Sequence, residues 1–121
     1  MATGFYKPHL PFVAPKKYYD RNPIKTIQLP PYQKNPQGAP KYATQPSWEL
    51  RGGYADFPKD YSVTITEDKQ KKLIQGYYAC VSFVDQQIGN VLAELDKLGL
   101  RENTVIVLWG DHGWHLGDHD M

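Results

Sequence analysis

One helical segment limits what this 121-residue chain can fold into. Apolar side chains recur at helical spacing between residues 66 and 98, namely Leu73, Tyr77, Val81, Val84, Ile88, Val91, Leu95 and Leu98. A helix over these residues would be roughly 48 Å long at ~1.5 Å per residue. A compact domain of this chain length has a diameter of only ~35 Å. We therefore expect the chain to be a piece of a larger protein.

The ends and the glycines of this helix carry further signals. Thr64-Ile65-Thr66-Glu67 has the form of a capping box. Its acidic residue, Glu67, would interact favourably with the positive end of the helix dipole. Gly99 is a natural C-terminal stop. Gly76 and Gly89 lower the helix propensity, so we expect each to mark the close approach of a neighbouring backbone.

Two segments of the chain are predicted to be strands. Residues 104–109, Thr-Val-Ile-Val-Leu-Trp, are rich in β-branched side chains and predict a buried strand, and residues 1–6 have the character of a strand's tail. A strand, a long crossover, a helix and a second strand form a βαβ unit with parallel strands. The carboxyl ends of both strands then share one edge of the sheet. We therefore expect His9 and the Asp111-His112 pair to face a common cleft.

The segment between the first strand and the helix is predicted to be a long irregular loop. Residues 7–63 contain all ten prolines, with turn signals at 35–38 and at Gly52-Gly53. A loop of this length is uncommon in a compact domain unless it is functional or packed on something larger. Disorder is the alternative, and the aromatic residues argue against it: Tyr32, Tyr42, Trp48, Tyr54 and Phe57.

The loop after the second predicted strand carries the candidate ligands. Residues 110–120 hold three acids and three histidines between glycines. Asp111 and His112 suit a divalent cation whose other ligands come from elsewhere, and a polar surface turn is the alternative. His115 and His119 have the spacing of a helical zinc pair. The glycines of this loop argue against a helix, so we expect His115 at the surface and His119 near the ligands or the substrate.

His9 is the second candidate. Proline precedes it at position 8 and follows it at position 11, which suits an imidazole held in one direction. Such a histidine can donate a proton or bind an anionic oxygen near neutral pH. The alternative is a histidine that caps a proline-rich turn.

Composition excludes several functions. The net charge of +1 gives no electrostatic basis for binding nucleic acid or an anionic membrane. No apolar run approaches the roughly 20 residues of a membrane span. The single cysteine, Cys80, cannot form an internal disulfide, and we expect it to be a buried, inert thiol.

Three motifs together resemble the type I sulfatases, and among them the iduronate-2-sulfatase-like branch. They are Gly-Phe-Tyr-Lys-Pro-His-Leu-Pro-Phe at 4–12, Tyr-Tyr-Ala-Cys-Val-Ser-Phe-Val-Asp-Gln-Gln-Ile-Gly at 77–89, and Asp-His-Gly-Trp-His-Leu-Gly-Asp-His at 111–119. The resemblance implies an alkaline-phosphatase-like α/β fold, of which this chain would supply one βαβ unit with a long Pro/Tyr-rich crossover and one long helix. It also implies hydrolysis of a sulfate ester, such as a sulfated carbohydrate, with calcium and a formylglycine nucleophile. A periplasmic, secreted or lysosomal location would follow.

The resemblance also suggests roles for individual residues. Asp111 and His112 match metal ligands, and His9 matches the histidine that contacts the sulfate and assists departure of the leaving group. We assign Lys7 and His119 as substrate-binding. The chain departs from the family in lacking the Cys-x-Pro-x-Arg nucleophile motif and the early Asp-Asp pair, and the expected active-site lysine would lie beyond Met121.

These features predict a partial sulfatase catalytic domain that is inactive by itself. Residues 1–12 would form the strand end and active-site loop, 13–63 the irregular loop, 64–99 the helix, and 104–121 the strand and metal-binding loop. Its partner would be the remainder of its own catalytic domain. Two other functions stay open: a phosphate or phosphonate ester hydrolase of the alkaline phosphatase superfamily, and a non-catalytic remnant or interaction module that binds through its Pro/Tyr loop.

Overall fold

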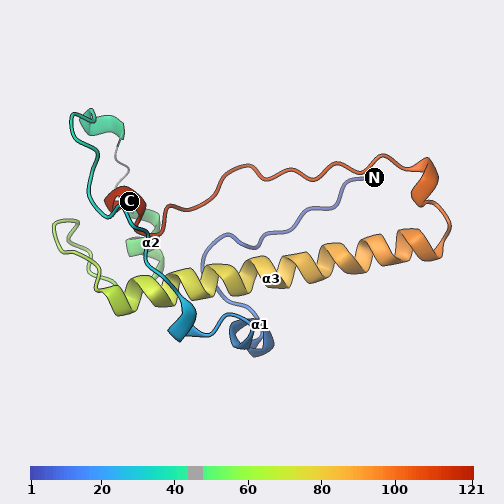
Figure 1. The fold of residues 1–121 in the computed structure, drawn as a ribbon, viewed down its shortest axis with the longest axis horizontal. Helices are drawn as coiled ribbons and strands as arrows, with labels where there is room; N and C mark the ends of the chain where they lie inside the picture. The colour runs from blue at the N-terminus through green and yellow to red at the C-terminus, as the bar shows by residue number, and fades with distance from the viewer. Residues whose placement is uncertain (44–47) are drawn as a thin grey trace.

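The computed structural model describes residues 1–43 and 48–121 and is dominated by one helix, α3, over Glu67–Lys97 (Figure 1). Residues 44–47 of the predicted 13–63 loop lie outside the described part. The other helices are short: α1 over Lys16–Asp20, α2 over Trp48–Gly53, and 3-10 turns over Ile24–Thr26, Lys41–Ala43, Arg101–Asn103 and Asp118–Asp120. The predicted irregular loop therefore contains short helices and 3-10 turns, which its many prolines made difficult to predict.

The predicted long helix is confirmed almost to the residue. It follows Thr66, whose backbone is extended (φ −61°, ψ 150°) and whose side chain makes no capping hydrogen bond. Because the N-cap is Thr66 and not Thr64, the capping box predicted over residues 64–67 does not form. At the other end Gly99 has φ +67°, a left-handed conformation that glycine adopts without a Cβ clash. The Gly99 and Leu100 N–H groups donate to the carbonyls of Asp96 and Leu95, at 3.0 and 3.1 Å. This is a Schellman motif, and it confirms the predicted stop.

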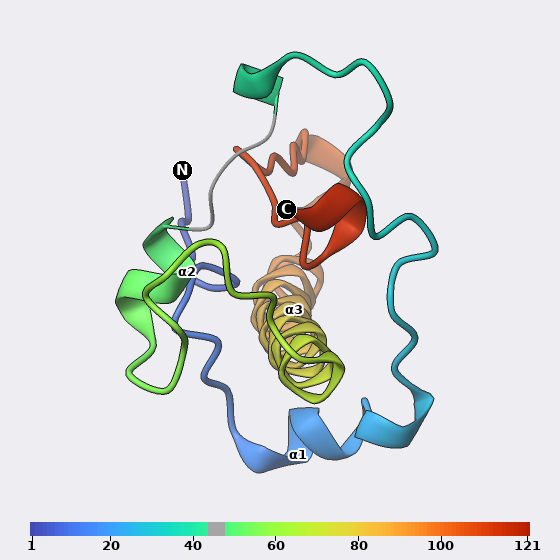
Figure 2. The same cartoon turned by 90° about the vertical axis from the view of Figure 1, so that its left-hand side faces the viewer.

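The α1 helix packs on one side of α3, opposite the two extended segments (Figures 1 and 2). Tyr18 is 1% exposed, and its ring lies 5.5 Å from that of Phe83 on α3. The Gln75 amide of α3 donates to the Asn22 carbonyl at 2.8 Å, which fixes the end of α1 against the helix. The N-terminal half of α3 is thereby covered from this side.

A small core joins α2, residues 10–12 and the N-terminal half of α3. Its buried members are Leu10, Phe12, Leu50, Phe57, Leu73 and Cys80. The buried Arg51 of α2 donates to the carbonyls of Pro58 and Asp60 from Nη1, at 3.1 and 2.9 Å, and to that of Val63 from Nη2 at 2.9 Å. The loop after α2 is therefore folded around one guanidinium group.

The two helix glycines have different surroundings. A Cβ on Gly76 would meet the Phe12 Cβ at 3.0 Å and its carbonyl oxygen at 3.4 Å, so the expected close approach is confirmed. A Cβ on Gly89 would meet nothing within 4 Å, and the same expectation is wrong there. The physical reason is that none of the described segments packs against α3 at Gly89.

Residues 1–6 and 104–110 both run back over α3 in the same direction, as parallel strands would (Figure 1). Within residues 1–43 and 48–121, however, no strand is formed, so the predicted βαβ unit is not confirmed. The predicted burial of 104–109 is wrong for this chain, since Val105, Val107 and Trp109 are 91%, 82% and 85% exposed. A strand is buried only when neighbours flank both edges and layers cover both faces. The described segments do not supply those neighbours.

Throughout the described part of the chain, no helix combines the length and the apolar character needed to cross a membrane.

Candidate active site

A pocket of about 230 Å³ lies where the N-terminal segment meets the loop that follows residues 104–110. Its lining residues are Phe5, Tyr6, Lys7, Pro8, His9, Tyr77, Asp111, His112 and Trp114. The predicted juxtaposition of His9 with Asp111 and His112 is therefore present. It arises although the two extended segments are not hydrogen-bonded to each other as strands.

The loop that carries His9 is held in place by the buried residues that follow it. Leu10 and Phe12 are 7% and 5% exposed, and the Lys7–Pro8 and Leu10–Pro11 peptide bonds are both cis. The backbone N–H of Phe12 donates to the Tyr54 hydroxyl at 2.6 Å, and the Tyr19 hydroxyl donates to the Phe12 carbonyl at 2.5 Å. Burial raises the pKa of both tyrosines, so their hydroxyls keep their protons throughout the neutral range. The main chain next to His9 is thus anchored by neutral donors and acceptors.

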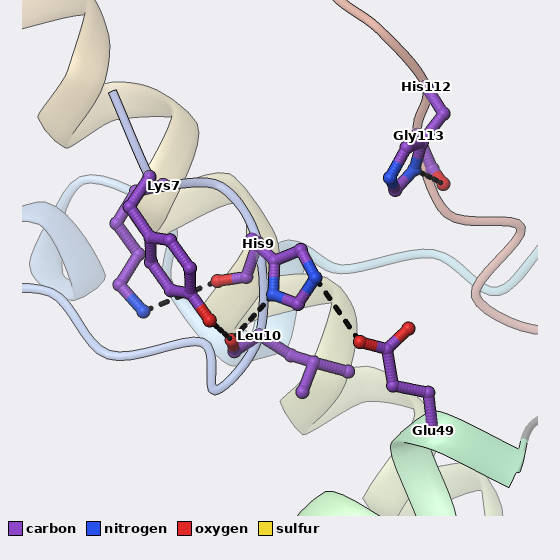
Figure 3. Close-up of polar contacts among 7 residues, drawn as sticks. Lys7, His9, Leu10, Glu49, His112 and Gly113 are labelled. Carbon is purple, nitrogen blue, oxygen red and sulfur yellow. Dashed lines mark hydrogen bonds and ion pairs between the residues drawn. The ribbon is translucent and has the colours of Figure 1, made fainter. Parts of the chain in front are cut away.

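The imidazole of His9 makes two polar contacts (Figure 3). Its Nδ1 lies 2.8 Å from the Leu10 carbonyl oxygen, which can only accept, so Nδ1 carries a hydrogen. Its Nε2 lies 3.2 Å from Oε1 of Glu49 on α2. The side chains of His9 and Glu49 are 32% and 40% exposed, so the pair is partly open to solvent.

Trp114 joins the two sides of the pocket. Its ring centroid lies 6.2 Å from that of His9, 5.8 Å from that of Phe12 and 6.4 Å from that of His112. The His9 and His112 rings are themselves 6.5 Å apart in an edge-to-face arrangement. Sequence reasoning did not assign Trp114 to the site. The signal that could have found it is a large aromatic residue within a glycine-rich polar loop, two positions after His112.

Asp111 and His112 are exposed and interact mainly with their own backbone. The His112 N–H donates to Asp111 Oδ1 at 3.0 Å, and His112 Nδ1 lies 3.2 Å from the Gly113 carbonyl oxygen. No group of three or more metal-ligating side chains occurs in the part of the chain that the structure describes. Calcium usually takes about 6–8 oxygen ligands. These two residues alone therefore do not fit a complete calcium site, although their chemistry fits part of one.

The two predicted substrate-binding residues lie differently. Lys7 lines the pocket, but its ammonium donates to the carbonyls of His9, at 3.3 Å, and Pro11. His119 lies outside this pocket: its ring stacks on that of Tyr32 at 5.8 Å, and its N–H donates to the Tyr32 carbonyl at 2.5 Å. The structure therefore brings Lys7, but not His119, to His9.

His115 is exposed, as expected, and no α-helix includes it together with His119, which argues against the zinc pair. Cys80 is completely buried, and burial raises the pKa of its thiol. The expectation of a buried thiol is confirmed.

Glu49 was not predicted from the sequence, because it lies in the segment predicted to be irregular.

Comparisons with known proteins show the family to which the chain belongs. A family model described as sulfatase matches residues 3–121. Over 98% of its length the chain is 40% identical to the iduronate 2-sulfatase of Mus musculus and 39% identical to a sulfatase of Formosa agariphila. It is 28% identical, also over 98% of its length, to a multifunctional alkaline phosphatase superfamily protein of Trinickia caryophylli. The chain spans only 22–24% of the length of these relatives.

Proposed function

The chain belongs to the sulfatase family, and from that premise we propose that it is part of the catalytic domain of a sulfuric-ester hydrolase. Membership of the family implies an alkaline-phosphatase-like α/β fold. We propose that residues 1–6 and 104–109 become parallel strands of that fold when the remainder of the domain supplies their neighbours. The segments 1–12, 13–63, 64–99 and 104–121 then serve as strand end and active-site loop, crossover, helix, and strand with metal-binding loop.

The observation that carries the proposal is the shared pocket of His9, Asp111 and His112. A histidine that can donate a proton lies opposite a carboxylate and an imidazole that can bind a cation. Hydrolysis of a sulfate ester needs both functions, because charge builds up on the sulfate oxygens and on the departing alkoxide. The similarity to iduronate 2-sulfatase supports a sulfated carbohydrate as the substrate.

His9 would act as the acid. Its Nδ1–H is engaged by the Leu10 carbonyl, so the proton that it gives to the leaving group would be on Nε2, and the leaving-group oxygen would have to take the place of the Glu49 carboxylate that Nε2 now faces. Transfer of this proton to the alkoxide oxygen leaves the ring neutral and still anchored through Nδ1. Lys7 and His119 remain proposed substrate contacts, and each would first have to leave its present partners.

Asp111 and His112 would supply two ligands of a calcium ion, with the other ligands donated by the rest of the domain. A cation held there would neutralise charge on the sulfate oxygens. The residues of this chain contribute an exposed carboxylate and imidazole on adjacent positions, held on a loop that Trp114 packs against His9.

A pair of variants in the complete protein tests the proposal. His9→Ala should lower kcat for a sulfate ester by about 10²–10⁴-fold, the usual contribution of general acid catalysis, with calcium affinity little changed. His115→Ala, an exposed histidine outside the pocket, is the matched control and should retain full turnover. Equal turnover by His9→Ala and wild type would contradict the role of His9.

The isolated 121-residue chain should hydrolyse no sulfate ester, because the nucleophile motif of the family does not occur in its sequence. The measurement is release of 4-nitrophenol from 4-nitrophenyl sulfate, compared with a heat-denatured sample. Release above that background would contradict the proposal that this chain is only one part of the site.

A second candidate function is hydrolysis of phosphate or phosphonate esters. It is favoured by the similarity to the multifunctional alkaline phosphatase superfamily protein. The complete protein should be assayed with 4-nitrophenyl phosphate and with the sulfate in parallel. A larger kcat/KM for the phosphate would favour this second function.

A further inference from the structure

Tyr77 of α3 lines the candidate active-site pocket together with residues of the two extended segments and the loops that follow them. We infer that the Tyr77 hydroxyl donates a hydrogen bond to a sulfate oxygen of the substrate. The inference rests on the proposed function, in which this pocket receives a sulfate ester. Tyr77 would then be a substrate-binding residue, because its hydroxyl touches the substrate directly and does not act through another side chain.

The ring of Tyr77 is held in place by packing. It lies against the small core, and its centroid is 5.5 Å from that of Phe12 in an edge-to-face arrangement at 75°. Such a geometry is favourable for two aromatic rings. The preceding residue, Gly76, is buried, and a Cβ there would meet the Phe12 Cβ at 3.0 Å, so α3 approaches Phe12 closely. The hydroxyl therefore keeps its position without needing a hydrogen bond of its own.

The Tyr77 hydroxyl lies beside the loop that carries the proposed metal ligands. A Cβ built on Gly113 would be 3.8 Å from the Tyr77 hydroxyl oxygen. Gly113 directly follows Asp111 and His112, which line the same pocket. The proposed place of the sulfate group, between His9 and this loop, therefore adjoins the hydroxyl.

The hydroxyl of Tyr77 differs from those of the other tyrosines around the His9 loop. Tyr6, Tyr19 and Tyr54 each form a hydrogen bond with the main chain of residues 10–12. In the part of the chain that the structure describes, the Tyr77 hydroxyl makes no hydrogen bond to the protein. The first three hydroxyls stabilise the loop, whereas that of Tyr77 is available to a ligand in the pocket.

The chemistry of the hydroxyl suits a sulfate group. A phenol hydroxyl can donate a hydrogen bond, and the oxygens of a sulfate can only accept one. The other donor proposed to contact the substrate, the Lys7 ammonium, is directed at the carbonyls of His9 and Pro11. Tyr77 needs no such rearrangement. A fixed donor at a charged oxygen is a strong form of electrostatic stabilisation.

The test uses Tyr77→Phe in the complete protein, a variant that keeps the ring and removes only the hydroxyl. The dissociation constant for inorganic sulfate, measured by calorimetric titration, should rise about 10-fold, the usual effect of losing a hydrogen bond to a charged group. We expect kcat/KM for 4-nitrophenyl sulfate to fall by at least the same factor. The affinity for calcium and the urea midpoint of unfolding should not change.

Tyr78→Phe is the matched control. Tyr78 is the next residue of α3, is 48% exposed and does not line the pocket, so this variant should bind sulfate as the wild type does. A series of phenyl sulfates with leaving groups of graded acidity adds a second discrimination. The loss in Tyr77→Phe should be the same factor across the series, because the sulfate group is common to all of these substrates.

The inference is overturned by an unchanged sulfate affinity in Tyr77→Phe, by an equal loss in Tyr78→Phe, or by a loss that grows as the leaving group becomes poorer. It is also overturned by a weakened calcium affinity at unchanged sulfate affinity, since the hydroxyl would then serve Asp111. Failure of the proposed function is a different result, namely a wild-type protein that hydrolyses no sulfate ester. In that case the titration with sulfate still decides the role of Tyr77, and a wild-type protein that binds no sulfate overturns it.

Discussion

The two halves of α3 carry the same apolar pattern and have opposite surroundings. In the first half Leu73 and Ile74 are 7% and 4% exposed, and Ala79 and Cys80 are completely buried. In the second half Val91 is 39% exposed, and Leu98, the C-cap that follows it, is 61% exposed. We call the first half with α1, α2 and residues 9–12 the packed region, and the second half with residues 1–6 and 104–110 the open region. An apolar stripe thus selects the face that can be buried, while burial itself depends on what the rest of the chain places there.

The candidate active site lies where these two regions meet. His9 and its partner Glu49 belong to the packed region or contact it directly, whereas Asp111 and His112 follow the open segment 104–110. The side of the site with the proposed acid, His9, is therefore organised within this chain. For the proposed calcium ion, the described part of the chain supplies two ligands, Asp111 and His112, of the about 6–8 that calcium usually takes.

The largest expected effect is that of replacing Asp111, which lies on the open side of the site. In the complete protein, Asp111→Ala should abolish tight calcium binding and lower turnover by more than about 10³-fold, because a hard cation depends on its carboxylate ligands. Calorimetric titration with calcium gives a readout that does not depend on activity. Asp118→Ala, which removes the ion-pair partner of His119 on the same loop, is the control. Tight calcium binding by Asp111→Ala would show that Asp111 is not a ligand.

Thiol reactivity tests the exposure of the two regions directly. In the 121-residue chain, a Val105→Cys thiol in a Cys80→Ala background should react with a thiol reagent at once, since Val105 is 91% exposed. The natural Cys80 thiol should react at least about 10²-fold more slowly, because the reagent reaches this buried thiol only when the packed region opens locally.

The same Val105→Cys variant in the complete protein sharpens the comparison. If the remainder of the domain completes the sheet, the new thiol should become as protected as Cys80. Rapid reaction of both thiols in the complete protein would contradict the proposed pairing of residues 104–109.

Substitution of the two helix glycines should change the stability of the protein by smaller amounts and in opposite directions. Gly76→Ala should destabilise the protein by about 1 kcal/mol, since strain against the Cβ of Phe12 exceeds the gain in helix propensity. Gly89→Ala should stabilise it by about 0.5–1 kcal/mol, because nothing in the described chain obstructs a Cβ there. Urea unfolding followed by circular dichroism measures both changes. A loss at Gly89 equal to that at Gly76 would show that the open half of α3 is covered just as closely.

The smallest expected effect is a decline in stability at alkaline pH that originates in the packed region. Burial raises the pKa of Cys80 from an ordinary 9.0, and those of Tyr19 and Tyr54 from 10.0. The unfolded chain therefore loses these protons at a lower pH than the folded chain does. Their contribution to stability is complete below about pH 9 and is lost as the pH rises through the raised values. The urea midpoint should fall between pH 9 and 11, and Cys80→Ala should remove the earliest part of the decline; a midpoint independent of pH would contradict it.

The features that the sequence predicts correctly are mostly those that local chemistry decides. The periodicity from Leu73 to Leu98 predicted α3, and Gly99 predicted its end, because a helix and its stop depend on residues within a few positions of each other. The sequence also placed His9 near Asp111 and His112, since the order of the elements already implied two segments running in one direction. The same reasoning failed for the capping box and for the burial of residues 104–109.

Only the tertiary structure decided which surfaces are covered and which side chains meet. Nothing in the local sequence distinguishes Gly76 from Gly89, yet Phe12 lies against one and no described residue lies against the other. Glu49 is forty residues from His9, and its contact depends on α2 packing against Leu10. The physical reason is that helix propensity and turn geometry are properties of neighbouring residues, whereas burial and side-chain pairing depend on segments that are distant in the sequence.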